Sequence, residues 1–180
     1  MIFNETKLAG AFLIEQELFE DVRGFFARSW SEREFAAAGL DARLVECNIS
    51  YNHRRGTLRG MHFQRAPRAQ AKLVRCTMGA IYDAIIDLRP ESPTFKQWIG
   101  VELTAENRRM LFVPEGFAHG FQTLVDRTEV FYQMSTAFAP EHASGVRWND
   151  PAFGIDWPDA GGDGERIIIA RDREYSDFTL

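Results

Sequence analysis

The sequence has few cysteines. Cys47 and Cys76 are the two cysteines of the 180 residues, and they do not form a CxxC pair. A structural zinc site needs closely spaced cysteine and histidine ligands, and a disulfide framework needs a denser set of cysteines. We therefore expect neither, and we interpret both cysteines as small residues of the hydrophobic core.

Long apolar runs are also missing. No window of about 18 apolar residues is present, which excludes a membrane-spanning helix. Residues 1–17 (MIFNETKLAGAFLIEQE) carry acidic side chains, whereas a secretory signal has a basic start followed by an apolar run. We therefore expect a soluble, cytoplasmic protein that does not bind membranes.

An excess of positive charge is lacking as well. The formal net charge is −5, which gives no general electrostatic attraction to nucleic acid or to an anionic membrane. Several cations nevertheless fall close together in the chain, either as a solvated face or as a binding site for an anionic small molecule. They are Arg54, Arg55, Arg59, Arg65, Arg68, Lys72 and Arg75.

Strand-like segments are plentiful. They are short, separated by turn residues, and spaced by roughly 8 to 12 residues, as in a β-sandwich or barrel. The segments are 57–64, 71–88, 97–103, 108–114, 119–125 and 129–135. Gly79 divides the second one into a predicted hairpin. We predict a mainly β fold, an antiparallel jelly-roll barrel with a few short helices.

One helix and one irregular segment complete the predicted fold. In residues 31–40 (SEREFAAAGL), Ser31 and Glu34 have capping-box spacing, and Gly39 can end the helix. From about residue 150 the chain is rich in glycine, proline and aspartate, which predicts loop structure. The length favours one domain, covering 1–180 with an irregular C-terminal segment at about 150–180.

The segment 58–64 (LRGMHFQ) raises a structural question. In a regular strand Arg59 and His62 point to opposite faces, so they cannot reach one pocket. Gly60 lies between them, and an isolated glycine in a strand often marks a bulge. If Arg59 and His62 serve the same site, we expect the strand to be irregular near Gly60.

A second segment, 114–119 (PEGFAH), places His119 just after a Pro–Gly turn. It fits the second half of the cupin signature, PxGxxH. The first half supplies two histidines as HxH in metal-binding cupins, but this chain has His62, Phe63 and Gln64 there. Two histidines and a glutamine are a poor ligand set for a transition metal. We therefore expect no metal.

Without a metal, the polar residues that could face the barrel interior suit proton transfer. The set lacks a convincing serine or cysteine nucleophile. A histidine titrates near neutral pH, a tyrosine can donate a proton, and cations can stabilise an oxyanion. A lysine among apolar residues can also extend to the surface instead. The candidates are Arg59, His62, Lys72, Asp83, His119 and Tyr132.

The sequence resembles the dTDP-4-dehydrorhamnose 3,5-epimerases of the cupin superfamily. The matching segments cover most of residues 17–158. They are 19–26 (FEDVRGFF), 56–64 (GTLRGMHFQ), 72–109, 113–121 (VPEGFAHGF) and 145–158 (GVRWNDPAFGIDWP). The resemblance implies a jelly-roll homodimer without metal or cofactor that acts in nucleotide-sugar biosynthesis.

The resemblance also implies catalytic roles. It makes His62 the general base and Asp172 the carboxylate that orients it, in the way that carboxylates orient other catalytic imidazoles. Tyr132 would return a proton from the opposite face, and Lys72 would lie beside the C4 oxygen of a nucleoside diphosphate-linked 4-keto-6-deoxy sugar. Removal of the C3 or C5 hydrogen gives an enolate, which the lysine stabilises.

Further residues are implied to bind the substrate. Asp83 would be the partner of His119, and an N-terminal arm (about 1–30) would reach the site of the neighbouring subunit. The residues implied for the diphosphate or sugar are Arg59, His119 and Asn48, and those implied on the arm are Arg23 and Phe26.

The chain departs from the family pattern on the nucleotide side. The departures are Arg28, Glu46, Phe138, Ala143 and Arg171, where the family usually has glutamate, glutamine, tyrosine, glutamate and lysine. They suggest a second hypothesis, an epimerase of the same chemistry on a CDP- or GDP-linked sugar, or one that inverts a single carbon. Two further classes stay open, a metal-dependent cupin isomerase or dioxygenase and a non-catalytic cupin that binds nucleotide sugars.

Overall fold

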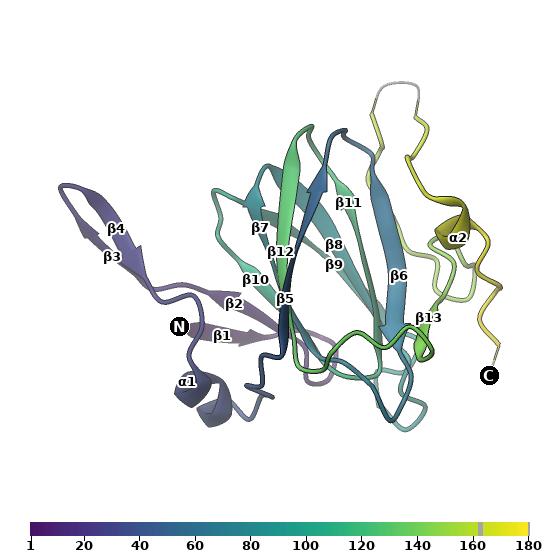
Figure 1. Cartoon of the computed structure of the whole chain (residues 1–180), viewed down its shortest axis with the longest axis horizontal. Coiled ribbons are helices and arrows are strands. Elements are labelled where there is room, and N and C mark those ends of the chain that lie inside the picture. Colours follow the sequence, from purple (N-terminus) through teal and green to yellow (C-terminus); the bar gives the residue numbers. More distant parts are fainter. Residues whose placement is uncertain (162–163, 180) are drawn as a thin grey trace.

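The computed structural model describes residues 1–161 and 164–179. Residues 162, 163 and 180 of the expected domain lie outside the described residues. Two antiparallel sheets face each other as the walls of a barrel (Figure 1), which confirms the predicted mainly β jelly roll. No helix of the described part is long and apolar enough to cross a membrane.

The larger sheet has six strands in the order β1-β2-β10-β7-β12-β5. These are β1 (Ile2–Glu5), β2 (Phe12–Glu15), β10 (Met110–Val113), β7 (Lys72–Met78), β12 (Thr128–Met134) and β5 (Glu46–Asn52). The opposite sheet has five strands in the order β13-β6-β11-β8-β9. These are β13 (Ala143–Gly145), β6 (Leu58–Gln64), β11 (Phe117–Thr123), β8 (Ala80–Asp87) and β9 (Trp98–Thr104).

The predicted hairpin at Gly79 is wrong. Strands β7 and β8 belong to different sheets and do not pair with each other. Gly79 adopts a positive φ of 76°, and a Cβ there would lie 2.6 Å from Thr128 Oγ1. The turn therefore carries the chain from one wall of the barrel to the other, because the apolar faces of both strands must cover the same core.

That core lies between the two sheets. Val74 of β7 and Leu111 of β10 meet Ile81 and Ile85 of β8 and Leu103 of β9, all of them fully buried. Cys76 is buried in the same cluster, as predicted. The core position predicted for Cys47 is wrong, because the outward alternation of β5 exposes this residue.

The predicted helix is present as α1 (Glu32–Ala37). Ser31 is its N-cap, and its side chain accepts a hydrogen bond from Glu34 N at 3.4 Å. Gly39 follows the helix with a φ of 73°, a conformation that glycine adopts without a steric cost.

Residues before α1 divide into two parts. Strands β1 and β2 belong to the larger sheet, whereas β3 (Leu18–Asp21) and β4 (Gly24–Ala27) form a separate hairpin that projects from the barrel (Figure 1). The hairpin exposes Phe19, Val22 and Phe26. Large exposed apolar side chains on a projecting element are typical of an interaction surface.

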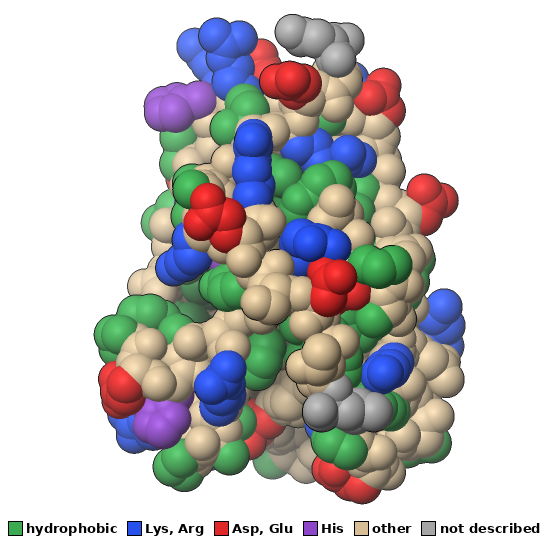
Figure 2. All heavy atoms as spheres, turned by 90° about the vertical axis from the view of Figure 1, so that its right-hand side faces the viewer, with side chains coloured by type: hydrophobic (Ala, Val, Ile, Leu, Met, Phe, Trp, Pro, Cys, Tyr) green, Lys and Arg blue, Asp and Glu red, His purple; other side chains and the backbone are tan. Residues whose placement is uncertain are grey.

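The C-terminal segment covers the outer face of the five-stranded sheet. Phe153 and Trp157 pack against Met61 and Ile86 there. Asp150 fastens the segment, because its carboxylate accepts hydrogen bonds from the backbone N–H groups of Ala152 and Phe178. On this side of the molecule basic and acidic side chains are intermixed, with apolar ones between them (Figure 2). The short helix α2 (Ala170–Arg173) lies in this segment.

A buried carboxylate at the end of β8 holds the loop that follows it. Asp87 accepts hydrogen bonds from Arg89, Ser92 and Thr94, and Arg89 also donates to Ala9 O at 2.7 Å. Burial alone would raise the pKa of Asp87, but these hydrogen bonds lower it to about 2. The ionised form of Asp87 therefore stabilises the fold.

We expect the protein to lose stability in acid in part through Asp87. A carboxyl whose folded pKa is depressed contributes stability above its unfolded pKa, near 4, and loses that contribution as the pH falls toward 2. Asp87→Asn should lower the free energy of unfolding by about 2 kcal/mol at pH 7 and flatten its decrease between pH 4 and 2.

Urea unfolding at a series of pH values measures this. Asp126→Asn is the control, because Asp126 is an exposed carboxylate that also accepts a backbone hydrogen bond, from Arg55 N. Equal losses of stability for the two variants at every pH would contradict the role of Asp87.

Candidate functional site

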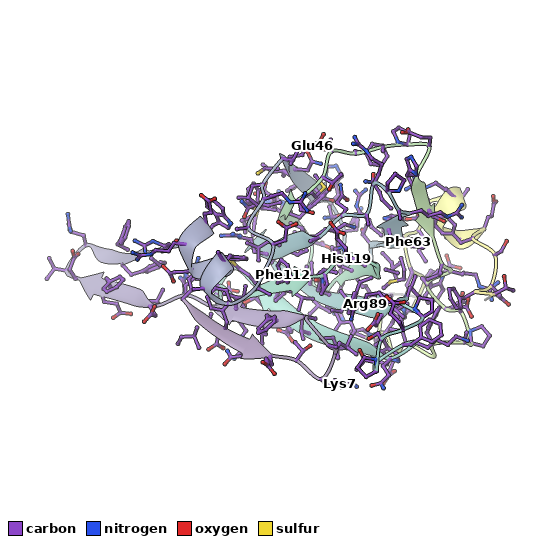
Figure 3. All side chains as sticks on the ribbon, turned by 90° about the horizontal axis from the view of Figure 1, so that it is seen from below. Lys7, Glu46, Phe63, Arg89, Phe112 and His119 are labelled. Carbon is purple, nitrogen blue, oxygen red and sulfur yellow. The ribbon has the colours of Figure 1, made fainter. Side chains whose placement is uncertain are left out.

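A cavity of about 400 Å³ opens between the two sheets. His62 and His119 reach it from the five-stranded sheet, and Lys72 and Tyr132 reach it from the six-stranded sheet. Figure 3 shows His119 among the strands in the barrel interior. An adjoining second cavity of about 330 Å³ shares His62, Lys72, Tyr132 and Arg171. These shared residues therefore stand where the two cavities meet.

Strand β6 is irregular at Gly60, as the sequence predicts. His62 is paired with His119 and Arg59 with Phe121, so β6 spans three residues where β11 spans two. Gly60 has a φ of 148°, and a Cβ there would lie 2.6 Å from Gly120 Cα. The extra residue is a β-bulge. It allows Arg59 and His62 to line the same cavity.

His62 and Asp172 form a hydrogen-bonded pair. His62 Nε2 lies 2.9 Å from Asp172 Oδ1, and the other carboxylate oxygen accepts a hydrogen bond from Gly60 N at 3.2 Å. Burial raises the pKa of Asp172, but the hydrogen bond and charge of His62, together with the hydrogen bonds from Gly60 N and Arg171, outweigh burial and lower the pKa. Because the ionised Asp172 can only accept, Nε2 carries the proton and Nδ1 keeps a free lone pair.

The environment of His62 also keeps it neutral. Burial lowers the pKa of His62, the bond with Asp172 partly opposes that, and the nearby charges of Lys72 and Arg171 lower it again. A neutral, oriented imidazole with one free lone pair is the form that a general base requires.

A second histidine–carboxylate pair lies deeper in the barrel. His119 Nε2 is 2.8 Å from Asp83 Oδ1, and Asp83 is fully buried. Within the described residues, Asp83 Oδ2 has no hydrogen-bond partner. Such a buried acceptor is costly unless a cation or a ligand compensates for it.

Lys72 supplies a cation at this point. Burial lowers the pKa of Lys72 to about 8, although the charge of Asp83 partly opposes the shift. Among the described residues its Nζ has one hydrogen-bond partner, the His62 carbonyl at 3.5 Å. Lys72 therefore lines both cavities with its ammonium group and does not extend to the outer surface.

The remaining predicted residues fall into two groups. Arg59 lines the first cavity, with its Nε bonded to Asn52 Oδ1 at 2.8 Å. Asn48, Phe138 and Ala143 line the second cavity, and Arg171 lines both. Glu46 contacts this wall through its carboxylate, which accepts a hydrogen bond from Phe138 N at 3.1 Å.

Three predicted residues lie elsewhere in this chain. Arg23 and Phe26 belong to the β3–β4 hairpin and line neither of the two cavities. Arg28 follows the hairpin and forms an ion pair with Glu34 at 2.7 Å. A single chain does not bring these residues to the site.

Several parts of the cavity walls were not predicted from the sequence, among them Gln64 and Gln70 of the second cavity. Ser50 lines the first cavity, and within the described chain its buried Oγ has no hydrogen-bond partner. Ile167, Ile168 and Ile169 close the same cavity from the C-terminal segment. Ser50 lies two residues after Asn48 in β5, so both side chains point to the barrel interior. This strand was not predicted from the sequence, and Ser50 was therefore not identified.

Metal binding has little support from the side chains. Within residues 1–161 and 164–179, no group of three or more His, Cys, Asp or Glu side chains could hold a metal ion. His62 and His119 each bond a different carboxylate, an arrangement that suits proton transfer.

The chain is similar to a family of known proteins along nearly its whole length. The family model described as dTDP-4-dehydrorhamnose 3,5-epimerase matches residues 5–179. The dTDP-4-dehydrorhamnose 3,5-epimerase of Methanothermobacter thermautotrophicus is 46% identical over 173 residues, which are 96% of this chain and 92% of that protein. The Escherichia coli protein of the same name is 42% identical, covering 97% of this chain and 92% of its own length.

Solved structures of similar proteins have the same fold as this chain. The crystal structure of the Bacillus anthracis dTDP-4-dehydrorhamnose 3,5-epimerase with TDP and PPi bound superposes with a TM-score of 0.92 at 45% identity, covering 98% of this chain and 99% of that one. An epimerase from Legionella pneumophila in complex with dTDP-4-keto-L-rhamnose has a TM-score of 0.87 at 34% identity, covering 95% and 89% of the chains.

We expect Gly60→Ala to destabilise the protein and to disturb the His62–Asp172 pair. The added Cβ would collide with the Gly120 backbone and would also require a φ that L-residues rarely adopt. Together these effects should cost about 2–4 kcal/mol. Urea unfolding measures the loss of stability, and an NMR titration of the His62 imidazole measures the change in its pKa.

Gly154→Ala is the matched control. Gly154 also has a positive φ, of 59°, but nothing lies within 4 Å of an added Cβ. This variant should show the cost of backbone strain alone and leave the His62 titration unchanged. An equal cost for both variants would mean that the close approach of Gly60 and Gly120 is unimportant.

Proposed function

The chain belongs to the dTDP-4-dehydrorhamnose 3,5-epimerase family and is an isomerase, and from this premise we propose that it inverts C3 and C5 of a dTDP-linked 4-keto-6-deoxy sugar by proton transfer through an enolate. One observation carries the proposal. His62 and Tyr132 extend from opposite sheets into the same two cavities, with Lys72 beside them.

The proposed step follows from the acidity of the substrate. The hydrogens on C3 and C5 both lie alpha to the C4 ketone, so removing either leaves an enolate with its charge on the C4 oxygen. His62 Nδ1 takes the proton from one face, and the Tyr132 hydroxyl delivers its proton to the same carbon from the other face. This inverts the carbon and leaves imidazolium and phenolate, which return to their starting forms by proton exchange with solvent.

Electrostatics lower the barrier in this scheme. The Lys72 ammonium faces the C4 oxygen, where negative charge develops, and the interaction is strong because the site is buried. Asp172 stabilises the imidazolium that forms on His62, as carboxylates do in other catalytic dyads. Asp83 has the equivalent place beside His119.

The diphosphate and nucleotide would occupy the outer part of the two cavities. Arg59 and Arg171 provide donors for phosphate oxygens there, and Asn48 and Phe138 line the second cavity. The more deeply placed His119 would face the sugar. The solved relative from Bacillus anthracis that holds TDP supports dTDP over CDP, UDP or GDP as the nucleotide. Isothermal titration of the protein with the four diphosphates tests this choice.

We further propose that the chain is one domain that works as a homodimer. The β3–β4 hairpin, with Arg23, Phe26 and the adjacent Arg28, would reach the site of a second copy. Its exposed apolar side chains, and those of Ile49 and Tyr51 on the outer face of β5, would be covered in the dimer.

Deuterium exchange at C3 and C5 of the 4-keto sugar nucleotide in D2O tests the mechanism. We expect the wild-type protein to exchange both positions, and His62→Ala to exchange about 10²–10⁴-fold more slowly, as expected for loss of a general base. Tyr132→Phe should retain exchange at a reduced rate but lose inversion, because His62 can then return a proton to the face from which it removed one. Unimpaired exchange by His62→Ala would remove His62 from the mechanism.

The rate should also depend on pH in a specific way. Burial lowers the pKa of His62 below its usual 6.5. On the acid side, kcat/KM should therefore begin to fall at a pH below 6.5, where His62 becomes protonated and can no longer act as a base. Since the pKa of Lys72 is lowered to about 8, kcat/KM should also fall above that pH, as the ammonium loses its charge.

Lys72→Arg identifies the alkaline limb. A guanidinium stays protonated throughout this range, so the residual activity of this variant should no longer fall near pH 8. Steady-state kinetics between pH 5 and 10 measure the profile. An alkaline limb that stays at the same pH in Lys72→Arg would assign it to another group.

A further inference from the structure

The loop between β12 and β13 forms part of the second cavity. Phe138 lies on this loop and lines the cavity, although 57% of it is exposed. The loop is not part of a sheet, and yet side chains hold the backbone of each of its residues from 136 to 139. Gln70 Nε2 donates to Thr136 O, Gln64 Nε2 to Ala137 O at 3.3 Å, Phe138 N to Glu46 Oε2 at 3.1 Å, and Ala139 N to Gln64 Oε1 at 2.7 Å.

Gln64 contributes most to this arrangement. It is almost fully buried, and its carboxamide bonds the C=O of Ala137 and the N–H of Ala139. These two hydrogen bonds resemble those that a neighbouring strand would make. In an extended chain, the C=O of one residue and the N–H of the residue two positions later point to the same side. The second carboxamide hydrogen goes to Arg68 O at 2.7 Å, so Gln64 also holds the loop that precedes β7.

Glu46 holds the same loop through Phe138, which lies between Ala137 and Ala139. In an extended segment the N–H of Phe138 points away from the side that Gln64 occupies, and it is this N–H that donates to Glu46. Gln64 from β6 and Glu46 from β5 therefore hold the peptide groups on both sides of the Phe138 side chain. Figure 3 shows Glu46 at the edge of the barrel.

We propose that Gln64, Glu46 and Gln70 are positioning residues that hold the Phe138 ring as a preformed wall of the second cavity, and that they thereby set the affinity for the nucleotide part of the substrate. The inference rests on the proposed function, since it takes this cavity as the nucleotide site. A wall ordered before binding avoids the entropic cost of ordering the loop when the ligand arrives.

Gln64 lines the second cavity, but its polar atoms mainly serve the protein backbone. Both carboxamide hydrogens donate to backbone C=O groups and the oxygen accepts from Ala139 N, so Gln64 has no donor left for the substrate. Because the loop does not carry His62, Lys72 or Tyr132, disturbing it should change binding much more than proton transfer.

Gln64→Met is the test variant, because methionine has a similar length and no strong hydrogen-bonding group. We expect KM for the dTDP-linked 4-keto sugar to rise about tenfold, and Kd for dTDP to rise in parallel, with kcat within about twofold of the wild type; a tenfold change corresponds to about 1.4 kcal/mol. Glu46→Leu should likewise raise KM and Kd for dTDP with little change in kcat.

Glu46→Gln keeps an oxygen that can accept a hydrogen bond from Phe138 N, so its KM and Kd for dTDP should remain close to those of the wild type.

Gln122→Met is the control for a purely structural effect. Gln122 is also a fully buried glutamine, and its carboxamide bonds Pro158 O and Arg166, but it lines neither cavity. Its variant should lose thermal stability, as Gln64→Met should, but without the rise in KM.

Combining variants shows whether Gln64 acts through Phe138. Phe138→Ala alone should raise KM, and adding Gln64→Met to it should raise KM little further, because effects on one shared element are not additive. An unchanged KM in Gln64→Met, a fall confined to kcat, or a full additional rise in the Phe138→Ala background would each overturn the inference. If the wild type binds dTDP but exchanges no deuterium, the proposed function fails, and Kd for dTDP alone still decides the inference.

Discussion

The site depends on the hydrogen bonds that the buried Asp172 accepts. One carboxylate oxygen accepts a hydrogen bond from Gly60 N, at the bulge, and the other accepts a hydrogen bond from His62 Nε2. These two bonds join the C-terminal segment to strand β6 and at the same time orient the imidazole. A shift of the segment would therefore misdirect the histidine, since the interaction that fixes its tautomer also holds the chain in place.

Buried charge is concentrated around the same place. Asp83, Lys72 and Asp172 carry ionisable groups in a low-dielectric interior, where each would be costly alone. Their arrangement reduces that cost in part, because the charge of Lys72 interacts favourably with that of Asp83 and each histidine bonds a carboxylate. Among the described residues, Asp83 Oδ2 has no hydrogen-bond partner and Lys72 Nζ has a single long one, so compensation is incomplete there, and this is where the polar atoms of a ligand would fit.

The sequence predicted those features that depend on a few neighbouring residues. The capping box at Ser31 predicted α1, and the isolated glycine at Gly60 predicted the bulge, because each rests on the conformations that a few neighbouring residues can adopt. The hairpin at Gly79 failed, because strand partners are chosen by the core that both faces must cover. Cys47 failed for a related reason, since β5 has alternating inward and outward positions and its outward face is open.

The order of the amino acids was enough to indicate the fold class, the residue types of the site and, through its motifs, the family. How those residues act together depends on the folded chain. Folding places His62 and Tyr132 on facing sheets, brings Asp172 to a strand more than a hundred positions earlier, and leaves the β3–β4 hairpin far from its own cavity. The physical reason is that strand alternation and caps act over a few residues, whereas the pairing of strands and the closing of a barrel depend on burying apolar surface contributed by the whole chain.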